Sequence, residues 1–220
     1  YKKKKIKFYQ ASSSEMFGKS KPPQNEKTLF QPRSVYAISK VFAYYSVIHY
    51  REAYNLHSCN GILFNHESPR RGVNFVTKKI IQGLTRIKNG KQKILVLGNL
   101  YSRRDWGHAK DYVESMWRIL QQKKPDDFVV ATRTSHSVKD FINISAKKIG
   151  IKLIWKNKGL KEVGIDKTNN KTIITVNKKY FRETEVDDLI GDYSKAKRLL
   201  KWKPKYSFNA LVDDMIKNEK

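Results

Sequence analysis

Residues 9–18 read YQASSSEMFG, and they mark the end of the first predicted strand. They continue an apolar run that predicts a strand over residues 5–12. The run then changes at once to three serines, a glutamate and a turn glycine. A turn needs only one or two such residues. Four polar side chains at a strand end therefore indicate either a crowded loop or a chemical site.

The composition is that of a globular protein without a membrane segment. The 220 residues are 39% hydrophobic and 12% aromatic, which suits a packed core. There is no run of about 18 apolar residues, and the N-terminal lysines lack the apolar core of a secretion signal. The single cysteine, Cys59, excludes an internal disulfide and suits a reducing compartment. We therefore expect a cytoplasmic protein.

The formal net charge of +26 is the most unusual number in the composition. It comes from 35 lysines and 11 arginines, and the lysines are scattered between the apolar segments. Nucleic-acid binders gather charge on one face and favour arginine for bidentate contacts. The pattern indicates solvated surface lysines more than a nucleic-acid site. A polyanion partner remains the alternative.

Strands and helix-length segments alternate along the chain, which predicts an α/β fold with a parallel sheet up to about residue 132. The predicted strands are 5–12, 58–64, 93–99, 127–132, 152–155 and 171–176. The predicted helices are 34–54, 75–89, 108–122, 137–150, 193–201 and 207–218. Short elements after residue 132 indicate a second, smaller lobe. We therefore divide the chain into residues 1–132 and 133–220.

Two further predictions concern helix ends and the core. Ser34 is expected to cap its helix, and a Ser-x-x-Asp pattern with Gly150 should delimit the helix at 137–150. The aromatic residues expected in the core are Tyr44, Tyr45, Trp106 and Trp117. Cys59 is expected beneath the sheet, and the histidines lack metal-ligand spacing, so no metal site is predicted.

The segment YAISK places Tyr36 and Lys40 four residues apart on one face of the long predicted helix. An ammonium near a phenol favours the phenolate, which makes tyrosine usable as a base near neutral pH. The spacing alone is weak evidence, because Tyr1 and Lys5 share it. The serine-rich strand end some twenty residues earlier strengthens it.

Five segments together resemble the GDP-mannose 4,6-dehydratase family, an extended branch of the short-chain dehydrogenase/reductases. They are YQASSSEMFG, PRSVYAISK, CNGILFNHESPRRG, RDWGHAKDYV and YFRETEVDDLIGD. The resemblance runs from about residue 6 to residue 215. It implies a partial Rossmann-like parallel sheet with helices on both faces and a smaller C-terminal α/β substrate lobe. Residues 1–132 would be the C-terminal part of the NADP-binding domain with interleaved segments of the substrate lobe, and residues 133–220 would be mainly the nucleotide-sugar-binding lobe.

The resemblance implies the conversion of GDP-D-mannose to GDP-4-dehydro-6-deoxy-D-mannose. Tyr36, assisted by Lys40, would take the C4 hydroxyl proton. Glu15 would take the C5 proton and assist the loss of the C6 hydroxyl as water. Ser13, where the family usually has threonine, would hydrogen-bond the C4 oxygen. Related epimerases have an uncharged residue at the position of Glu15.

The resemblance also implies binding roles. NADP would be held by Tyr36, Lys40, His66 and Arg71. The nucleotide sugar, GDP-mannose, would be held by Asn65, Val76, Lys79, Arg104, Arg182 and Glu185. Here residues 182–185 read RETE where the family usually has Arg-Pro-Ala-Glu, and without the proline we expect a less rigid loop.

The sequence contains no Gly-x-Gly or Gly-x-x-Gly, so the glycine-rich phosphate turn of a dinucleotide fold is missing. We expect a fragment that lacks the first part of the nucleotide-binding domain and has weak or no activity alone. The family also implies a homodimer or homotetramer, with SPRRG near an interface. The alternatives are another nucleotide-sugar epimerase or dehydratase, and an inactive polyanion-binding remnant.

Overall fold

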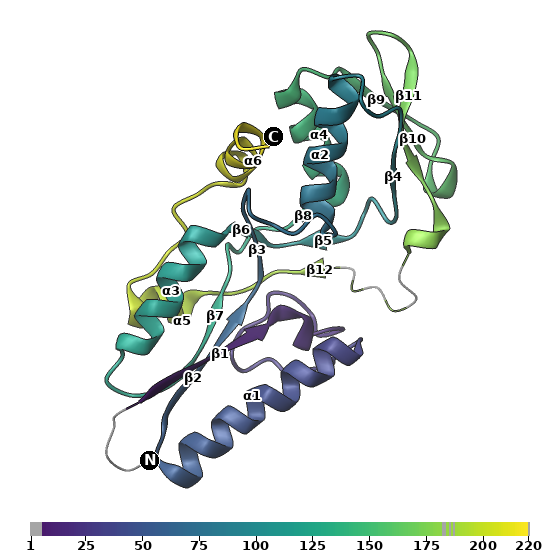
Figure 1. The fold of residues 1–220 in the computed structure, drawn as a ribbon. Helices are drawn as coiled ribbons and strands as arrows, with labels where there is room; N and C mark the ends of the chain where they lie inside the picture. The colour runs from purple at the N-terminus through teal and green to yellow at the C-terminus, as the bar shows by residue number, and fades with distance from the viewer. Residues whose placement is uncertain (1–5, 182–183, 185, 187, 220) are drawn as a thin grey trace. The chain divides into compact units, whose positions relative to one another are not determined.

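The structure is a computed structural model that describes residues 6–181, 184, 186 and 188–219. The chain forms two compact units, each assembled from three segments (Figure 1). Unit 1 contains residues 1–66, 104–135 and 188–206, and unit 2 contains residues 67–103, 136–187 and 207–220. The functional division at residue 132 stays a prediction. The chain passes between the units close to that position, after Ser135.

Unit 1 is built on a parallel sheet of three strands in the order β1-β2-β7 (Figure 1). The strands are β1 (Lys7–Ser13), β2 (His57–Leu63) and β7 (Asp127–Val130). Ser13 pairs with Leu63 and Leu63 with Val130, so the three strands end at the same level. The polar run after β1 therefore lies at the carboxyl edge of the sheet, which is where open parallel sheets carry their ligands.

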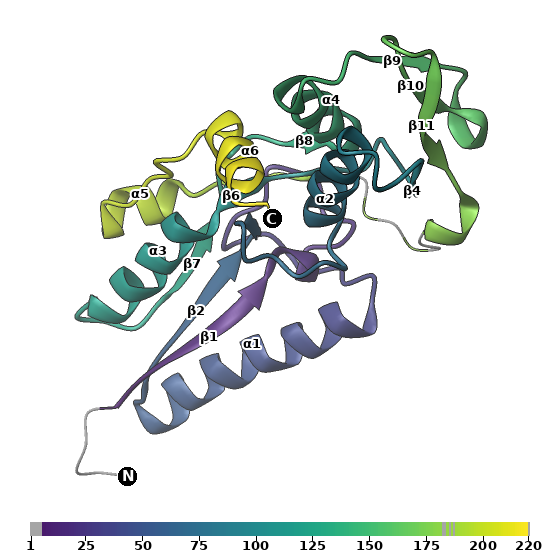
Figure 2. The same ribbon diagram turned by 45° about the horizontal axis from the view of Figure 1, so that its top comes forward.

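The helices of unit 1 cover both faces of this sheet, because alternate side chains of a strand point to opposite faces. The helices are α1 (Val35–Tyr54), α3 (Ala109–Gln121) and α5 (Ser194–Leu200). Figure 2 shows α1 running along β1 and β2. Ser58 and Asn60 of β2 donate hydrogen bonds to the α1 carbonyls of Val47 and Tyr44. These bonds fix α1 on one face.

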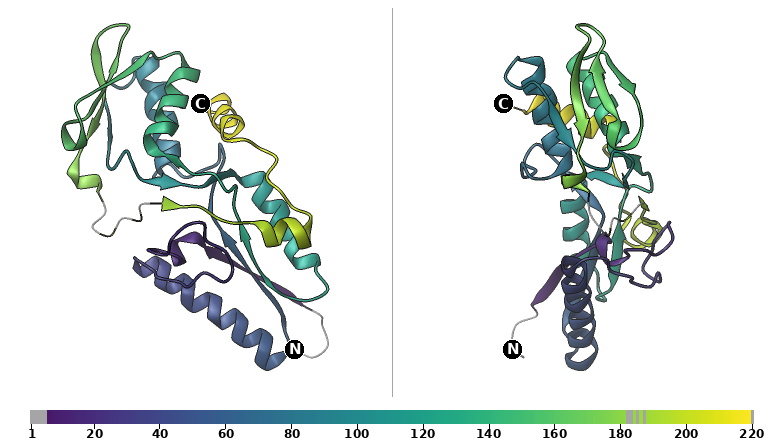
Figure 3. Two further views of the ribbon diagram at one scale, coloured as in Figure 1. Left: turned by 180° about the vertical axis from the view of Figure 1, so that it is seen from behind. Right: turned by 90° about the vertical axis from the view of Figure 1, so that its right-hand side faces the viewer.

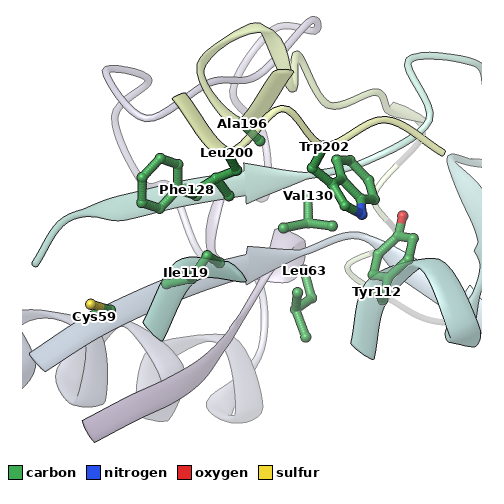
Figure 4. Close-up of a cluster of buried hydrophobic side chains, with 9 residues drawn as sticks. All are labelled: Cys59, Leu63, Tyr112, Ile119, Phe128, Val130, Ala196, Leu200 and Trp202. Carbon is green, nitrogen blue, oxygen red and sulfur yellow. The ribbon is translucent and has the colours of Figure 1, made fainter. Parts of the chain in front are cut away.

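The opposite face of the sheet carries the main apolar cluster of unit 1. Strand residues Cys59, Leu63, Phe128 and Val130 pack there with Trp202 and with side chains of α3 and α5 (Figure 4). The two helices lie side by side (Figure 3). Burial of these side chains supplies most of the local stability, at about 1.5–3 kcal/mol for a large apolar side chain. The burial of Cys59 confirms its predicted place.

Unit 2 has a sheet of its own, of mixed direction, in the order β4-β11-β10-β9. Its strands, labelled in Figure 1, are β4 (Leu95–Leu97), β9 (Leu153–Lys156), β10 (Val163–Asp166) and β11 (Lys171–Val176). Its helices are α2 (Val76–Lys88), α4 (Val138–Ile149) and α6 (Phe208–Lys217).

The remaining elements are short. The strands are β3 (Asn65–Glu67), β5 (Arg103–Arg104), β6 (Trp106–His108), β8 (His136–Ser137) and β12 (Asp188–Leu189). The 3-10 turns are η1 (Ser14–Met16), η2 (Gly159–Lys161) and η3 (Lys178–Tyr180). Among the described residues, no helix combines the length and apolar character needed to cross a bilayer.

Three sequence predictions about packing are wrong. The strand expected at 93–99 does not join the parallel sheet, because β4 pairs with β11 in unit 2. Trp117 and Tyr45 were expected in the core but are 64% and 55% exposed. Trp106 and Tyr44 are buried as expected. Periodicity identifies an apolar segment but not the partner that covers it.

Candidate active site

The end of β1 forms the first part of the site. Ser13 has an extended backbone and is the N-cap of η1, where its Oγ accepts a hydrogen bond of 3.2 Å from the backbone N–H of Glu15. Small hydroxyl side chains favour such positions because they satisfy an N–H that the turn leaves free. The three serines therefore end the strand and begin a tight turn that carries Glu15.

Glu15 lies beside Arg104. Its Oε1 is 4.0 Å from the Arg104 Nε, and the two side chains are 23% and 11% exposed. Arg104 ends β5 and also belongs to unit 1. The site thus holds a partly buried carboxylate next to a guanidinium, a group whose planar set of donors suits phosphate oxygens.

Helix α1 brings Tyr36 and Lys40 to the same strand end. Ser34 caps the helix as predicted, and its Oγ accepts from the Ala37 N–H at 3.1 Å. The Lys40 Nζ donates to the Ala11 carbonyl of β1 at 2.9 Å and lies 5.7 Å from the centre of the Tyr36 ring. Tyr36 is 55% exposed. The amine therefore links α1 to β1 and keeps two further protons for other acceptors.

The end of β2 contributes Asn65 and His66, both in β3. The Nδ1 of His66 is 2.9 Å from the Phe64 carbonyl, and its ring stacks on Tyr112 with centres 4.9 Å apart. The Asn65 Oδ1 is buried and has no hydrogen-bond partner within the described part of the chain. An unpaired buried amide oxygen costs about 1–3 kcal/mol, so this position is suited to a ligand that donates a hydrogen bond to it.

Unit 2 holds Arg71 in a loop before α2. Glu67 is 2% exposed. It accepts a hydrogen bond of 2.6 Å from Thr77 and lies 3.0 Å from the Arg71 Nε, while the Arg71 guanidinium stacks 3.5 Å above the Phe75 ring. Burial raises the pKa of Glu67, and Arg71 and Thr77 oppose that rise. The cation is therefore held from two sides in a fixed orientation.

Two other residues predicted to bind the nucleotide sugar, Val76 and Lys79, lie in α2 of unit 2. Val76 is the first residue of α2. The Lys79 Nζ lies 4.1 Å from the centre of the Tyr180 ring, a cation–π contact. Arg182 and Glu185 lie outside the described residues.

Two acids of the site region were missed from the sequence. Glu67 lies inside NHESPRRG, and its spacing of four from Arg71 was a usable signal. Asp105 follows Arg104 and is fully buried. Nothing local distinguishes it, because its partners, Thr132, Arg133 and Gly191, are distant in sequence. No cluster of three or more potential metal ligands occurs in the part of the chain that the structure describes.

The family of this chain is shown by its match to a known protein family. Residues 1–215 match the family described as GDP-mannose 4,6 dehydratase. The chain belongs to this family. The match covers nearly all 220 residues and confirms the resemblance seen in the five sequence segments.

Curated members of the GDP-mannose 4,6-dehydratase family give the same result. The chain is 53% identical over 215 residues to GDP-mannose 4,6 dehydratase of Drosophila melanogaster, covering 97% of this chain and 54% of that protein. It is 53% identical over 212 residues to the Homo sapiens protein of that name, covering 96% and 57%. The chain therefore spans a little over half the length of these relatives.

Solved structures support the fold class. RMD from Pseudomonas aeruginosa, complexed with NADPH, superposes with a TM-score of 0.80 at 18% identity, over 96% of this chain and 66% of that chain. dTDP-glucose 4,6-dehydratase from Bacillus anthracis, in complex with NAD, gives 0.77 at 19% identity, over 97% and 61%. The predicted α/β fold with a parallel sheet is confirmed.

Proposed function

We propose that the natural polypeptide containing these residues is a GDP-mannose 4,6-dehydratase. It would convert GDP-D-mannose to GDP-4-dehydro-6-deoxy-D-mannose and water. The observation that supports this most directly is a partly buried carboxylate, Glu15, at the end of the β1 strand that Lys40 links to the helix of Tyr36. A simple reductase needs the phenol and the amine but has no use for this acid.

The first proton transfer is assigned to Tyr36. The centre of its ring lies 5.7 Å from the Lys40 Nζ. The phenolate would take the proton of the C4 hydroxyl while the Ser13 hydroxyl hydrogen-bonds the C4 oxygen. With NADP bound, the C4 hydride would leave to the nicotinamide as this proton is taken, and the resulting C4 ketone would acidify the neighbouring C5–H bond.

The second proton transfer is assigned to Glu15. Its carboxylate would take the C5 proton and then, as the acid, protonate the departing C6 hydroxyl, so that water leaves and a C5–C6 double bond forms. One group can serve as base and then acid because the proton it gains is the proton it gives. Arg104, beside Glu15, is assigned to the diphosphate or the guanosine of the substrate.

The cofactor proposed is NADP, and the chemistry that it supplies when bound is reversible hydride transfer, without net oxidation of the sugar. The donors present fit part of such a group. Lys40 keeps two protons for ribose hydroxyls after its bond to Ala11. His66 and Arg71 are assigned to the same cofactor. Because the chain contains no glycine-rich phosphate turn, we expect it to bind NADP weakly and to show little activity by itself.

The remaining assignments concern the nucleotide sugar and the assembly. Asn65, Val76, Lys79, Arg182 and Glu185 are assigned to GDP-mannose. A homo-oligomer, a dimer or a tetramer, is supported by the apolar residues that α1 exposes, such as Val35 at 83% and Phe42 at 76%. Large exposed apolar patches mark interaction surfaces. Light scattering coupled to size-exclusion chromatography measures the mass that decides this.

The test of function is the conversion of GDP-mannose in deuterium oxide, followed by proton NMR. A dehydratase places solvent deuterium in the 6-deoxy product and leaves the total reduced nicotinamide unchanged. A 4-epimerase, the rival within the same superfamily, returns a sugar that still carries its C6 hydroxyl. Recovery of such a sugar would contradict the proposal.

A further inference from the structure

The carboxylate of Asp105 connects three separate segments of unit 1. The residue is 0% exposed. One oxygen accepts from the backbone N–H of Thr132 at 2.8 Å and from its hydroxyl at 2.6 Å. The other accepts from the N–H of Arg133 at 2.9 Å and of Gly191 at 3.2 Å. The four donors occupy the sites that an ionised carboxylate offers.

The segments that Asp105 holds cannot easily take other conformations. Arg133 has a left-handed backbone with φ of +66°, which is uncommon for a residue with a side chain. A Cβ on Gly191 would lie 2.3 Å from the Cβ of Ala131. The Asp105 backbone N–H also donates to the Leu189 carbonyl at 3.1 Å. The carboxylate therefore fixes a tightly packed junction at the carboxyl end of β7.

Arg104 is the residue immediately before Asp105, at the end of β5. In extended chain, adjacent side chains point in opposite directions. When Asp105 is held at the end of β7, the Arg104 side chain is directed away from that junction. Its Nε lies 4.0 Å from the Glu15 carboxylate, and its side chain is 11% exposed. The orientation of the guanidinium thus depends on the anchoring of its neighbour.

We propose that Asp105 is a positioning residue of this site, which keeps the Arg104 guanidinium beside Glu15 and directed at the substrate diphosphate. This inference rests on the proposed function for the role of Arg104. An ionised carboxylate is required, because an asparagine amide would face the N–H groups of Arg133 or of Thr132 with its own N–H groups. Two donors would then oppose each other at a buried position, and the junction would shift.

The test is a double-mutant cycle of Asp105→Asn and Arg104→Ala in the natural polypeptide that contains these residues. The readouts are the GDP dissociation constant, from calorimetry, and kcat and KM for GDP-mannose. A group misplaced by about 1 Å costs about 10²-fold, so we expect Asp105→Asn to weaken GDP binding and kcat/KM by up to about that factor. In the Arg104→Ala background the same change should have almost no effect, because the two residues act as one unit.

Glu26→Gln is the matched control. The Glu26 carboxylate accepts a hydrogen bond of 2.8 Å from the Val129 N–H of β7, in the same unit, and burial raises its pKa. We expect this change to lower the thermal midpoint without weakening GDP binding. If Asp105→Asn does not fold, Thr132→Val removes one donor to the same carboxylate and should give a smaller loss in the same direction.

The outcomes separate the two proposals. Failure of the wild type to dehydrate GDP-mannose contradicts the proposed function, whereas the GDP-binding cycle still tests Asp105. Additive losses from Asp105→Asn and Arg104→Ala, or equal binding losses from Asp105→Asn and Glu26→Gln, would show that Asp105 only stabilises the fold. An absence of GDP binding by the wild type would also overturn the positioning role.

Discussion

Two acidic residues of unit 1, Asp127 in β7 and Glu15 just after β1, have contrasting environments. Asp127 begins β7 and pairs with Asn60 of β2, which in turn pairs with Gln10 in the middle of β1. Glu15 instead follows the end of β1. Asp127 receives a bidentate pair of bonds from Arg51, at 2.9 and 2.8 Å, and further bonds from Asn60 and Tyr44. Glu15 has an ion contact with Arg104 at 4.0 Å.

The difference distinguishes a structural carboxylate from a chemical one. Buried polar groups are normally saturated with partners, because an unmade hydrogen bond is costly. Asp127 follows this rule, and its charge joins β2, β7 and α1. The Tyr44 pKa is raised, first by burial and then by Asp127, so the phenol stays neutral. A carboxylate that must take a proton from a substrate needs free acceptor positions, and Glu15 keeps them.

The largest effect on activity is expected from Glu15→Gln. If Glu15 is the C5 base, turnover of GDP-mannose should fall by about 10²–10⁴-fold, the usual contribution of a general acid–base group. The thermal midpoint should change little, because the side chain has few partners. Steady-state kinetics and a thermal melt measure the two. Full turnover in the variant would contradict the role.

Asp127→Asn should give the reverse result. Removing one charge from a buried ion pair destabilises a protein by about 3–5 kcal/mol, because the partner charge stays buried. Urea denaturation measures this loss, and activity per folded molecule should be retained. The neighbouring Asp126, which pairs with Lys195 at 2.7 Å and is 43% exposed, provides the control. Asp126→Asn should cost less than about 1 kcal/mol, and an equal cost would refute the distinction.

Asp105 is a third acidic residue of unit 1, and its carboxylate is saturated with hydrogen bonds like that of Asp127. Burial raises the pKa from 3.8 to about 6, against the opposing effect of its hydrogen bonds. Between these values the folded state binds more protons than the unfolded state, so this group's contribution to stability falls as pH rises from about 4 to about 6. Above that range its contribution is constant.

The measurement is the unfolding free energy of the wild type minus that of Asp105→Asn, across pH 4 to 7. The variant cannot titrate at this position, so the difference isolates the carboxyl group. We expect the difference to decrease as pH rises to about 6 and then to level off. An increase over the same range would mean that the hydrogen bonds outweigh burial.

The smallest expected effect comes from Ser13→Thr. Threonine keeps the hydroxyl that accepts from the Glu15 N–H at 3.2 Å, and its methyl group restricts the rotamer. We expect kcat to change by less than about threefold, an energy close to RT. Ser13→Ala, which removes the acceptor, should lower kcat clearly more. Equal effects of the two changes would show that the hydroxyl is not used.

Much of the local structure could be predicted from the sequence. Ser137 and Asp140 form the expected capping box, and Gly150 ends that helix with φ of +81°. These features depend on residues within a few positions of one another. The predicted places of β4, Trp117 and Tyr45 were wrong because each depends on which distant segment covers an apolar surface. Asp105 was missed for the same reason.

Periodicity and capping act over a few residues, so they were enough to predict where most strands and helices form and to place Tyr36 and Lys40 on one helix face. The place of β4 in a second sheet, the contact of Arg104 with Glu15, and the bond that Asp105 accepts from Gly191, 86 positions away, emerged from the folded structure. Such contacts depend on the joint packing of distant segments, and no local pattern encodes them.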